Sequence, residues 1–80
     1  MEKMYAWTET TNGHVMTVEG KNRWFIKQMK DDWYEIYEIV EQPDHCVLRD
    51  VKYSLWSAKH TAYLIEVNER NSRYAMREVI

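Results

Sequence analysis

The first half of the chain alternates between apolar and polar positions, which is the period of a half-buried β-strand. The alternation predicts strands at residues 4–10, 14–18 and 23–29. Asn12 and Gly13 separate the first two strands and predict a type I′ hairpin turn, because that turn needs positive φ at both central residues. Further turns at residues 19–22 and 30–32 favour antiparallel hairpins throughout.

Residues 33–42 fit two kinds of element. As a helix, the segment begins after an Asp32 cap, with Glu35 three residues later. Its apolar stripe then consists of Trp33, Ile36, Tyr37 and Val40. As a strand, its β-branched and aromatic side chains suit a pleated surface. We favour the strand, because β-type segments and turn signals flank it, and Pro43 ends the element in either case.

A further strand is predicted at residues 45–53, after which the pattern changes to the 3.6-residue period of a helix. Ser54 can cap this helix through its hydroxyl. The apolar stripe consists of Leu55, Ala58, Ala62 and Ile65. The helix is expected to end at residues 71–72, with residues 74–80 returning as a short strand or packed tail.

These elements predict a small α+β protein, with residues 1–80 as a single domain. About four to six hairpin-connected strands form an antiparallel sheet. One amphipathic helix covers a face of that sheet, because alternating strands are typical of a sheet with one buried face. The chain of 80 residues has no room for a second core.

The composition favours the cytoplasm. Cys46 is the only cysteine, so no internal disulfide can form, and a small protein without disulfides suits a reducing compartment. The first residues contain no apolar run of the kind found in a signal peptide, and no stretch is long enough to span a membrane. We therefore expect no membrane association.

Charge is distributed unevenly along the chain, although the formal net charge is only −2. Residues 31–44 contain six carboxylates and no basic residue, interleaved with Trp33, Tyr34 and Tyr37. Aromatic anchors and steering carboxylates suit a protein partner with a basic surface. An acidic edge that keeps the sheet soluble is an equally physical interpretation. The predicted partner-binding residues are Asp31, Asp32, Trp33, Tyr34, Glu35, Tyr37, Glu38, Glu41 and Asp44.

Catalytic and metal signatures are weak. His45 and Cys46 are adjacent on a predicted strand and so point to opposite faces, and Cys46 is expected to be a small buried residue. His14 and His60 form no ligand spacing with it. Acid–base catalysis by two carboxylates needs a cleft, which a sheet of this size rarely offers. We expect neither an enzyme nor a bound metal or cofactor.

The leading functional hypothesis is a non-enzymatic protein-binding module. Its size and composition resemble those of small phage-type inhibitors or adaptors that bind a host defence or nucleic-acid-processing protein. One alternative is single-stranded nucleic-acid binding, in which Trp24 and Phe25 stack on bases beside the basic residues Lys21, Arg23 and Lys27. A second alternative is a structural homo-oligomer that pairs through the edges of its sheet.

Overall fold

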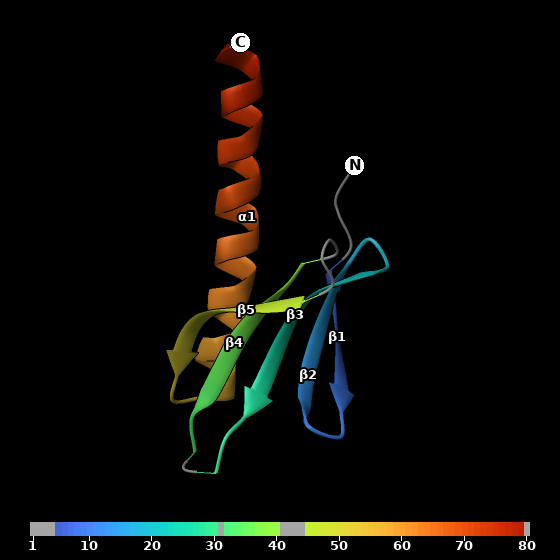
Figure 1. The fold of residues 1–80 in the computed structure, drawn as a ribbon, viewed down its shortest axis with the longest axis vertical. Helices are drawn as coiled ribbons and strands as arrows, with labels where there is room; N and C mark the ends of the chain where they lie inside the picture. Colours follow the sequence, from blue (N-terminus) through green and yellow to red (C-terminus); the bar gives the residue numbers. More distant parts are fainter. Residues whose placement is uncertain (1–4, 31, 41–44, 80) are drawn as a thin grey trace.

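The computed structural model describes residues 5–30, 32–40 and 45–79, with side chains as far as residue 69. Five strands form one antiparallel sheet whose order follows the sequence, and a helix packs against one face (Figure 1). The elements are β1 Tyr5–Thr10, β2 Gly13–Val18, β3 Lys21–Gln28, β4 Tyr34–Val40, β5 His45–Lys52 and α1 Leu55–Val79. The predicted α+β architecture is therefore confirmed.

The ambiguous segment is a strand, as we favoured. β4 pairs antiparallel with β3 on one side and with β5 on the other, so its backbone groups find partners in both neighbours. Ile36 is fully buried at the middle of β4 and lies opposite Ile26 of β3. Long-range pairing in the sheet thus decides between two patterns that the local sequence left open.

The first hairpin turn differs from the prediction. Thr11 and Asn12 form the turn, and Gly13 is already the first residue of β2, paired with Thr10. Among the described non-glycine residues, only Glu19 and Asp32 have positive φ. The type I′ assignment at Asn12 and Gly13 is therefore wrong.

Glycine serves a different purpose in each of the first two hairpins. A Cβ on Gly13 would lie 1.9 Å from the carbonyl oxygen of Ile26, so Gly13 permits the close approach of β2 and β3. The turn with positive φ at both central residues is the second one, where Glu19 has φ 53° and Gly20 has φ 82°.

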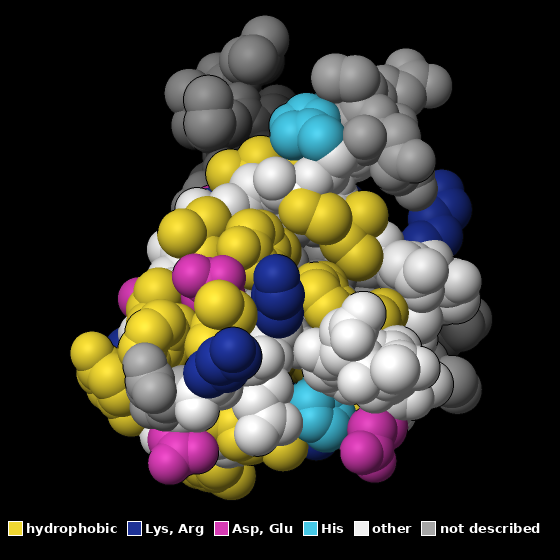
Figure 2. Space-filling view, turned by 60° about the horizontal axis from the view of Figure 1, so that its bottom comes forward, with side chains coloured by type: hydrophobic (Ala, Val, Ile, Leu, Met, Phe, Trp, Pro, Cys, Tyr) yellow, Lys and Arg dark blue, Asp and Glu magenta, His cyan; other side chains and the backbone are white. Residues whose placement is uncertain are grey.

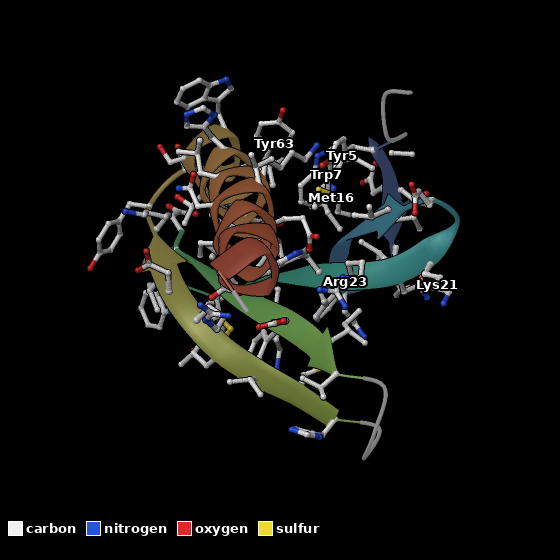
Figure 3. The ribbon with its side chains drawn as sticks, turned by 90° about the horizontal axis from the view of Figure 1, so that it is seen from above. Tyr5, Trp7, Met16, Lys21, Arg23 and Tyr63 are labelled. Atoms are coloured by element: carbon white, nitrogen blue, oxygen red, sulfur yellow. The ribbon has the colours of Figure 1, made fainter. Side chains whose placement is uncertain are left out.

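Two arginines interrupt the ladders. The β2–β3 register skips Arg23, and the β4–β5 register skips Arg49, so each is an extra residue in its strand. Such bulges bend a strand and increase its right-handed twist. The sheet accordingly curls around α1, which lies on its concave side (Figure 3).

The helix begins as predicted but ends later. The Ser57 N–H donates to Ser54 Oγ at 3.1 Å, which confirms the cap. Ala58 and Ala62 are fully buried against the sheet. However, α1 continues to Val79 and extends past the sheet (Figure 1), so the predicted end at residues 71–72 and the strand or tail after it are wrong. That segment contains no glycine or proline to stop the helix.

The core lies between the sheet and α1. Trp24 is its largest side chain and is completely buried. The other members, taken from β2, β3, β4 and α1, are Met16, Val18, Ile26, Ile36, Ala58 and Ala62. Tyr5 and Trp7 of β1 pack against this cluster from one side. The two small alanines let the helix axis approach the sheet, which allows the bulky Trp24 to be covered.

Candidate functional site

The pleat of β4 divides the acidic-aromatic block between the two faces of the sheet. Tyr34 packs against the core and Glu38 contacts the bulge arginines, so both are on the face that α1 covers. Glu35 and Tyr37 are hydrogen-bonded to each other on the opposite face, which we call the open face. The predicted binding residues of β4 thus do not form one continuous surface.

The remaining predicted residues lie around the ends of β4. Asp32 is exposed, with φ 60°, in the turn that leads into the strand. Trp33 is half-buried, and its carbonyl oxygen accepts a hydrogen bond from the Met29 N–H at 2.9 Å. Asp31, Glu41 and Asp44 lie outside the described residues.

Glu38 belongs to a network of charges between the sheet and α1. It forms ion pairs with Arg23, at 3.8 Å, and with Arg49. Arg23 also reaches Glu66 of α1 at 3.3 Å, and Arg49 reaches Glu69. The network fastens the helix to both bulges, and it engages Glu38 within the protein.

The most buried member of this network is Glu66, which is 4% exposed. Its Oε1 accepts a hydrogen bond from Trp24 Nε1 at 2.9 Å as well as one from Arg23. A carboxylate so far from water needs this pairing, since an unpaired buried charge is strongly destabilising. The hydrogen bond to Glu69 raises the pKa of the Arg49 guanidinium; partial burial opposes that shift and the Glu38 carboxylate adds to it.

The open face carries a row of apolar side chains across four strands. Val15, Phe25, Tyr37 and Leu48 are successive cross-strand partners from β2 to β5. The rings of Phe25 and Tyr37 are 6.5 Å apart, and Leu48 is 50% exposed. α1 covers the other face, so this row is uncovered by the described part of the chain.

Tyr37 has a polar end on this face. Its hydroxyl donates to Glu35 Oε1 at 2.7 Å. This hydrogen bond, with a smaller contribution from burial, raises the pKa of Tyr37 above its ordinary value of 10.0. Lys27 lies directly across the ladder from Glu35. The apolar row is therefore bordered by charged groups, as the centre of a binding surface usually is.

The nucleic-acid alternative loses one of its two aromatic residues. Trp24 is fully buried and donates its indole N–H to Glu66, so it cannot stack on a base. Phe25, its neighbour in β3, is on the opposite face. The prediction that these two rings act together is wrong. Cys46, expected to be buried, is exposed.

A second exposed aromatic group lies around the start of α1, and the sequence reasoning missed it. Tyr53 is 80% exposed and Trp56 is 72% exposed, with Trp56 stacked on His60 at 4.9 Å. Leu64 and Tyr63 of the same helix are also exposed. The signal was available, because Trp56, His60 and Leu64 recur every four residues on the side of the helix away from Ala58 and Ala62. A view from below shows hydrophobic side chains gathered across much of the surface (Figure 2).

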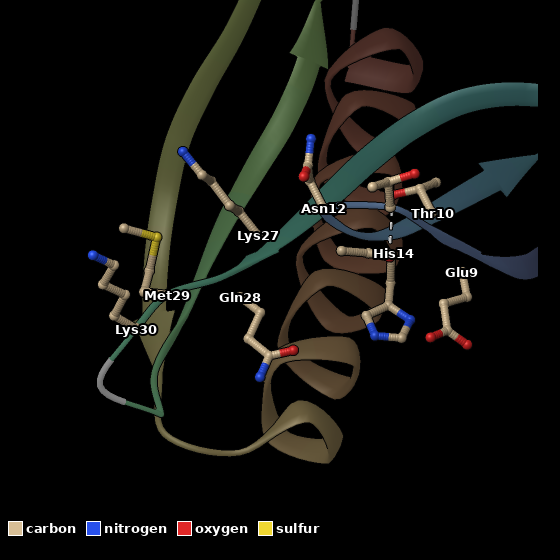
Figure 4. A pocket seen from close by; sticks show the side chains of 10 residues that line it. Glu9, Thr10, Asn12, His14, Lys27, Gln28, Met29 and Lys30 are labelled. Carbon is tan, nitrogen blue, oxygen red and sulfur yellow. Dashed lines mark hydrogen bonds between the residues drawn. The ribbon is translucent and has the colours of Figure 1, made fainter.

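A shallow hollow of about 440 Å³ lies between the β1–β2 turn and the end of β3 (Figure 4). Glu9 and His14, cross-strand partners, line one side, and Lys27 and Lys30 line the other. The Thr10 hydroxyl donates to the Gly13 carbonyl oxygen at 3.1 Å and steadies one wall. Glu9 is the only carboxylate among the described lining residues, so the hollow does not offer the paired carboxylates considered above.

Neither a metal site, nor a membrane span, nor a similarity to a known protein indicates a function. Within the described part of the chain, no three His, Cys, Asp or Glu side chains come together as a group that could hold a metal. The described helix contains no window apolar enough to cross a bilayer. No protein-family model, curated protein or solved structure matches this chain.

Proposed function

We propose that this protein is a non-enzymatic protein-binding module that contacts its partner with the open face of the sheet. The observation that supports the proposal is the apolar row of Val15, Phe25, Tyr37 and Leu48, fixed on four hydrogen-bonded strands. A rigid surface loses little conformational entropy on binding. Aromatic side chains with a polar tip, such as Tyr37, are frequent binding hot spots.

The charges around this face favour a basic partner. Of the six carboxylates in residues 31–44, Glu38 is engaged with the bulge arginines, whereas Glu35 is on the open face and Asp32 is exposed. The other three, Asp31, Glu41 and Asp44, lie within four residues of the ends of β4 in the sequence. Carboxylates at the rim of an apolar patch speed encounter with a positive surface and fix its orientation.

Proteins that process nucleic acids present such basic surfaces, because they bind phosphates. An inhibitor or adaptor of a protein of this class fits the proposal best. The partner would place basic side chains against the ends of β4 and an apolar patch against Phe25 and Tyr37. The open face is convex, since the sheet curls toward α1, so a flat or concave partner surface is required (Figure 3).

The test compares two surfaces on one scaffold. A protein is first captured from the source cells with the parent chain, identified and purified. Its Kd is then measured for Phe25→Ser/Tyr37→Ser and for the control Trp56→Ser/Leu64→Ser, with folding checked by circular dichroism. We expect the first pair to weaken binding by at least about 2 kcal/mol, the scale of a hot spot, and the control to bind like the parent.

The reverse result would move the binding surface to α1. Single-stranded oligonucleotides are tested beside the protein partner at two salt concentrations. If they bind with a steep salt dependence and the captured protein does not bind directly, the nucleic-acid alternative replaces this proposal.

A further inference from the structure

β5 is an edge strand, and its two halves differ in the features that would keep this edge from pairing with another chain. No described strand pairs with its outer edge. In the second half, Arg49 forms a bulge, the Asp50 carboxylate accepts a hydrogen bond from the Val51 N–H at 2.7 Å, and Lys52 adds a charge. Bulges and charges are the devices that keep an edge from pairing with another chain.

The first half, residues 45–48, has none of these devices. All four residues are exposed, with Val47 at 39% and Leu48 at 50%. The other edge of the sheet is different, because β1 exposes Ala6, Thr8, Glu9 and Thr10 and no large hydrophobic residue. The first half of β5 is thus the apolar, unprotected edge of this sheet.

We propose that residues 46–48 pair antiparallel with the same residues of a second copy, across a two-fold axis at Val47. Antiparallel pairing of one strand with itself is self-complementary, so a single patch forms both sides of the interface. The two sheets then join into one, with both helices on the same face. This inference does not rest on the function proposed above, which concerns the face of the sheet and not its edge.

The pleat of β5 selects the register. Cys46 and Leu48 lie opposite Ile39 and Tyr37, on the open face, whereas Val47 lies opposite Glu38, on the helix-covered face. Residues directly opposite each other must share a face. With Val47 opposite its own copy, Cys46 meets Leu48 twice, and these three residues place apolar side chains only against apolar ones. His45 falls opposite the Arg49 bulge at each end, which limits the pairing to residues 46–48.

The neighbouring registers are less favourable. An axis at Cys46 sets His45 against Val47, and an axis at Leu48 sets the Arg49 bulge against Val47, directly beside the axis. With the axis at Val47, the open-face row continues from Tyr37 and Leu48 of one copy to Cys46 and Ile39 of the other.

The proposed pairing involves few residues and should therefore be weak. A contact of so few residues falls below the ~1,200 Å² of a stable interface, so we expect weak association that requires a high protein concentration. Analytical ultracentrifugation over a concentration series measures it. Val47→Lys sets two ammonium groups opposite each other on the axis and should weaken association at least tenfold, whereas Thr8→Lys on the β1 edge should leave it unchanged. Circular dichroism confirms that both variants are folded.

The native thiol of Cys46 tests the register directly. Leu48→Cys places the new thiol opposite Cys46 of the second copy, so mild oxidation should give a covalent dimer on a non-reducing gel. Adding Val47→Lys should remove that dimer, and Thr8→Cys should give none.

Three results would overturn the proposal. The first is a parent chain that stays monomeric to several millimolar. The second is association that Thr8→Lys weakens as much as Val47→Lys does. The third is association that Tyr37→Ala abolishes and Val47→Lys leaves intact, which would place the contact on the open face.

Discussion

The helix-covered face and the open face of the sheet share the same strands and differ in what their side chains contact. On the covered face, Trp24 is enclosed by α1 and donates to Glu66, and Glu38 and Glu66 each form an ion pair with an arginine. On the open face, the rings of Phe25 and Tyr37 lie 6.5 Å apart, and Glu35 accepts a hydrogen bond from the Tyr37 hydroxyl. The covered face holds the fold together, which leaves the open face available for a partner.

The difference teaches that residue type alone does not assign a role in a short strand. Glu35 and Glu38 are three residues apart in the same acidic block, yet they lie on opposite faces. Glu38 is tied to two arginines from two bulges, whereas Glu35 faces Lys27 across the ladder. The pleat therefore separates a carboxylate that stabilises the fold from one that is proposed to steer a partner.

Adjacent aromatic residues of β3 provide the largest expected contrast. Trp24→Ala removes the largest buried side chain and leaves Glu66 without its indole donor. The free energy of unfolding, measured in urea, should therefore fall by about 3–5 kcal/mol. Phe25→Ala, on the open face, should lower the free energy of unfolding by less than about 1.5 kcal/mol. Equal losses would mean that the open face is covered as well.

The bulge arginine should show a smaller contrast. Arg49→Met leaves Glu38 and Glu69 without the cation that they share. We expect the free energy of unfolding to fall by about 1–2 kcal/mol. The expected loss is no larger because the Arg49 side chain is 27% exposed, so solvent screens its ion pairs. The control Lys27→Met, on the open face, should change the free energy of unfolding by no more than about 0.5 kcal/mol. A neutral Arg49→Met would show that the network does not fasten α1.

The smallest expected contrast between the two faces is in the pKa values of their tyrosines. Burial, followed by Glu66, raises the pKa of Tyr5 on the covered face, whereas the hydrogen bond to Glu35 raises the pKa of Tyr37 on the open face. Glu35→Ala should therefore lower the pKa of Tyr37 toward 10.0 and leave Tyr5 unchanged, as followed by two-dimensional NMR of the rings.

The sign of the linked stability follows from the same shift. Folded Tyr37 holds its proton more tightly than the unfolded chain does, so this stabilisation is complete below pH 10.0 and is lost as the pH rises through the folded pKa. Tyr37→Phe should flatten this part of the stability curve. If the free energy of unfolding of Tyr37→Phe falls at alkaline pH as steeply as that of the parent, Tyr37 is not the group responsible for the fall.

Local pattern predicted most of the fold. Alternation located the strands, and the cap at Ser54 with the stripe at Ala58 and Ala62 located the helix. The failures were at chain reversals and ends. Gly13 was assigned to a turn because its role in a close strand contact depends on Ile26, a residue of another strand. The helix end was placed at polar residues that do not stop a helix.

The division of the acidic block was only partly predictable. The period of two in β4 already separates Tyr34 and Glu38 from Glu35 and Tyr37 once the strand is accepted. What the sequence pattern could not supply was the partners of Glu38. They come from two bulges, whose positions depend on how β2 pairs with β3 and how β4 pairs with β5. The two arginines are held in turn by Glu66 and Glu69 of α1, which are distant in the sequence.

The most direct test of this account measures the stability and the partner affinity of two matched variants, Glu35→Gln and Glu38→Gln. Glu38→Gln should lower the free energy of unfolding by about 1–2 kcal/mol and, under conditions where it is folded, bind the partner like the parent. Glu35→Gln should lower the free energy of unfolding by no more than about 0.5 kcal/mol, because the amide oxygen can still accept from the Tyr37 hydroxyl. It should bind more slowly and show a weaker salt dependence of association. If Glu38→Gln slows binding and Glu35→Gln does not, the faces are wrongly assigned and the partner contacts the helix-covered side.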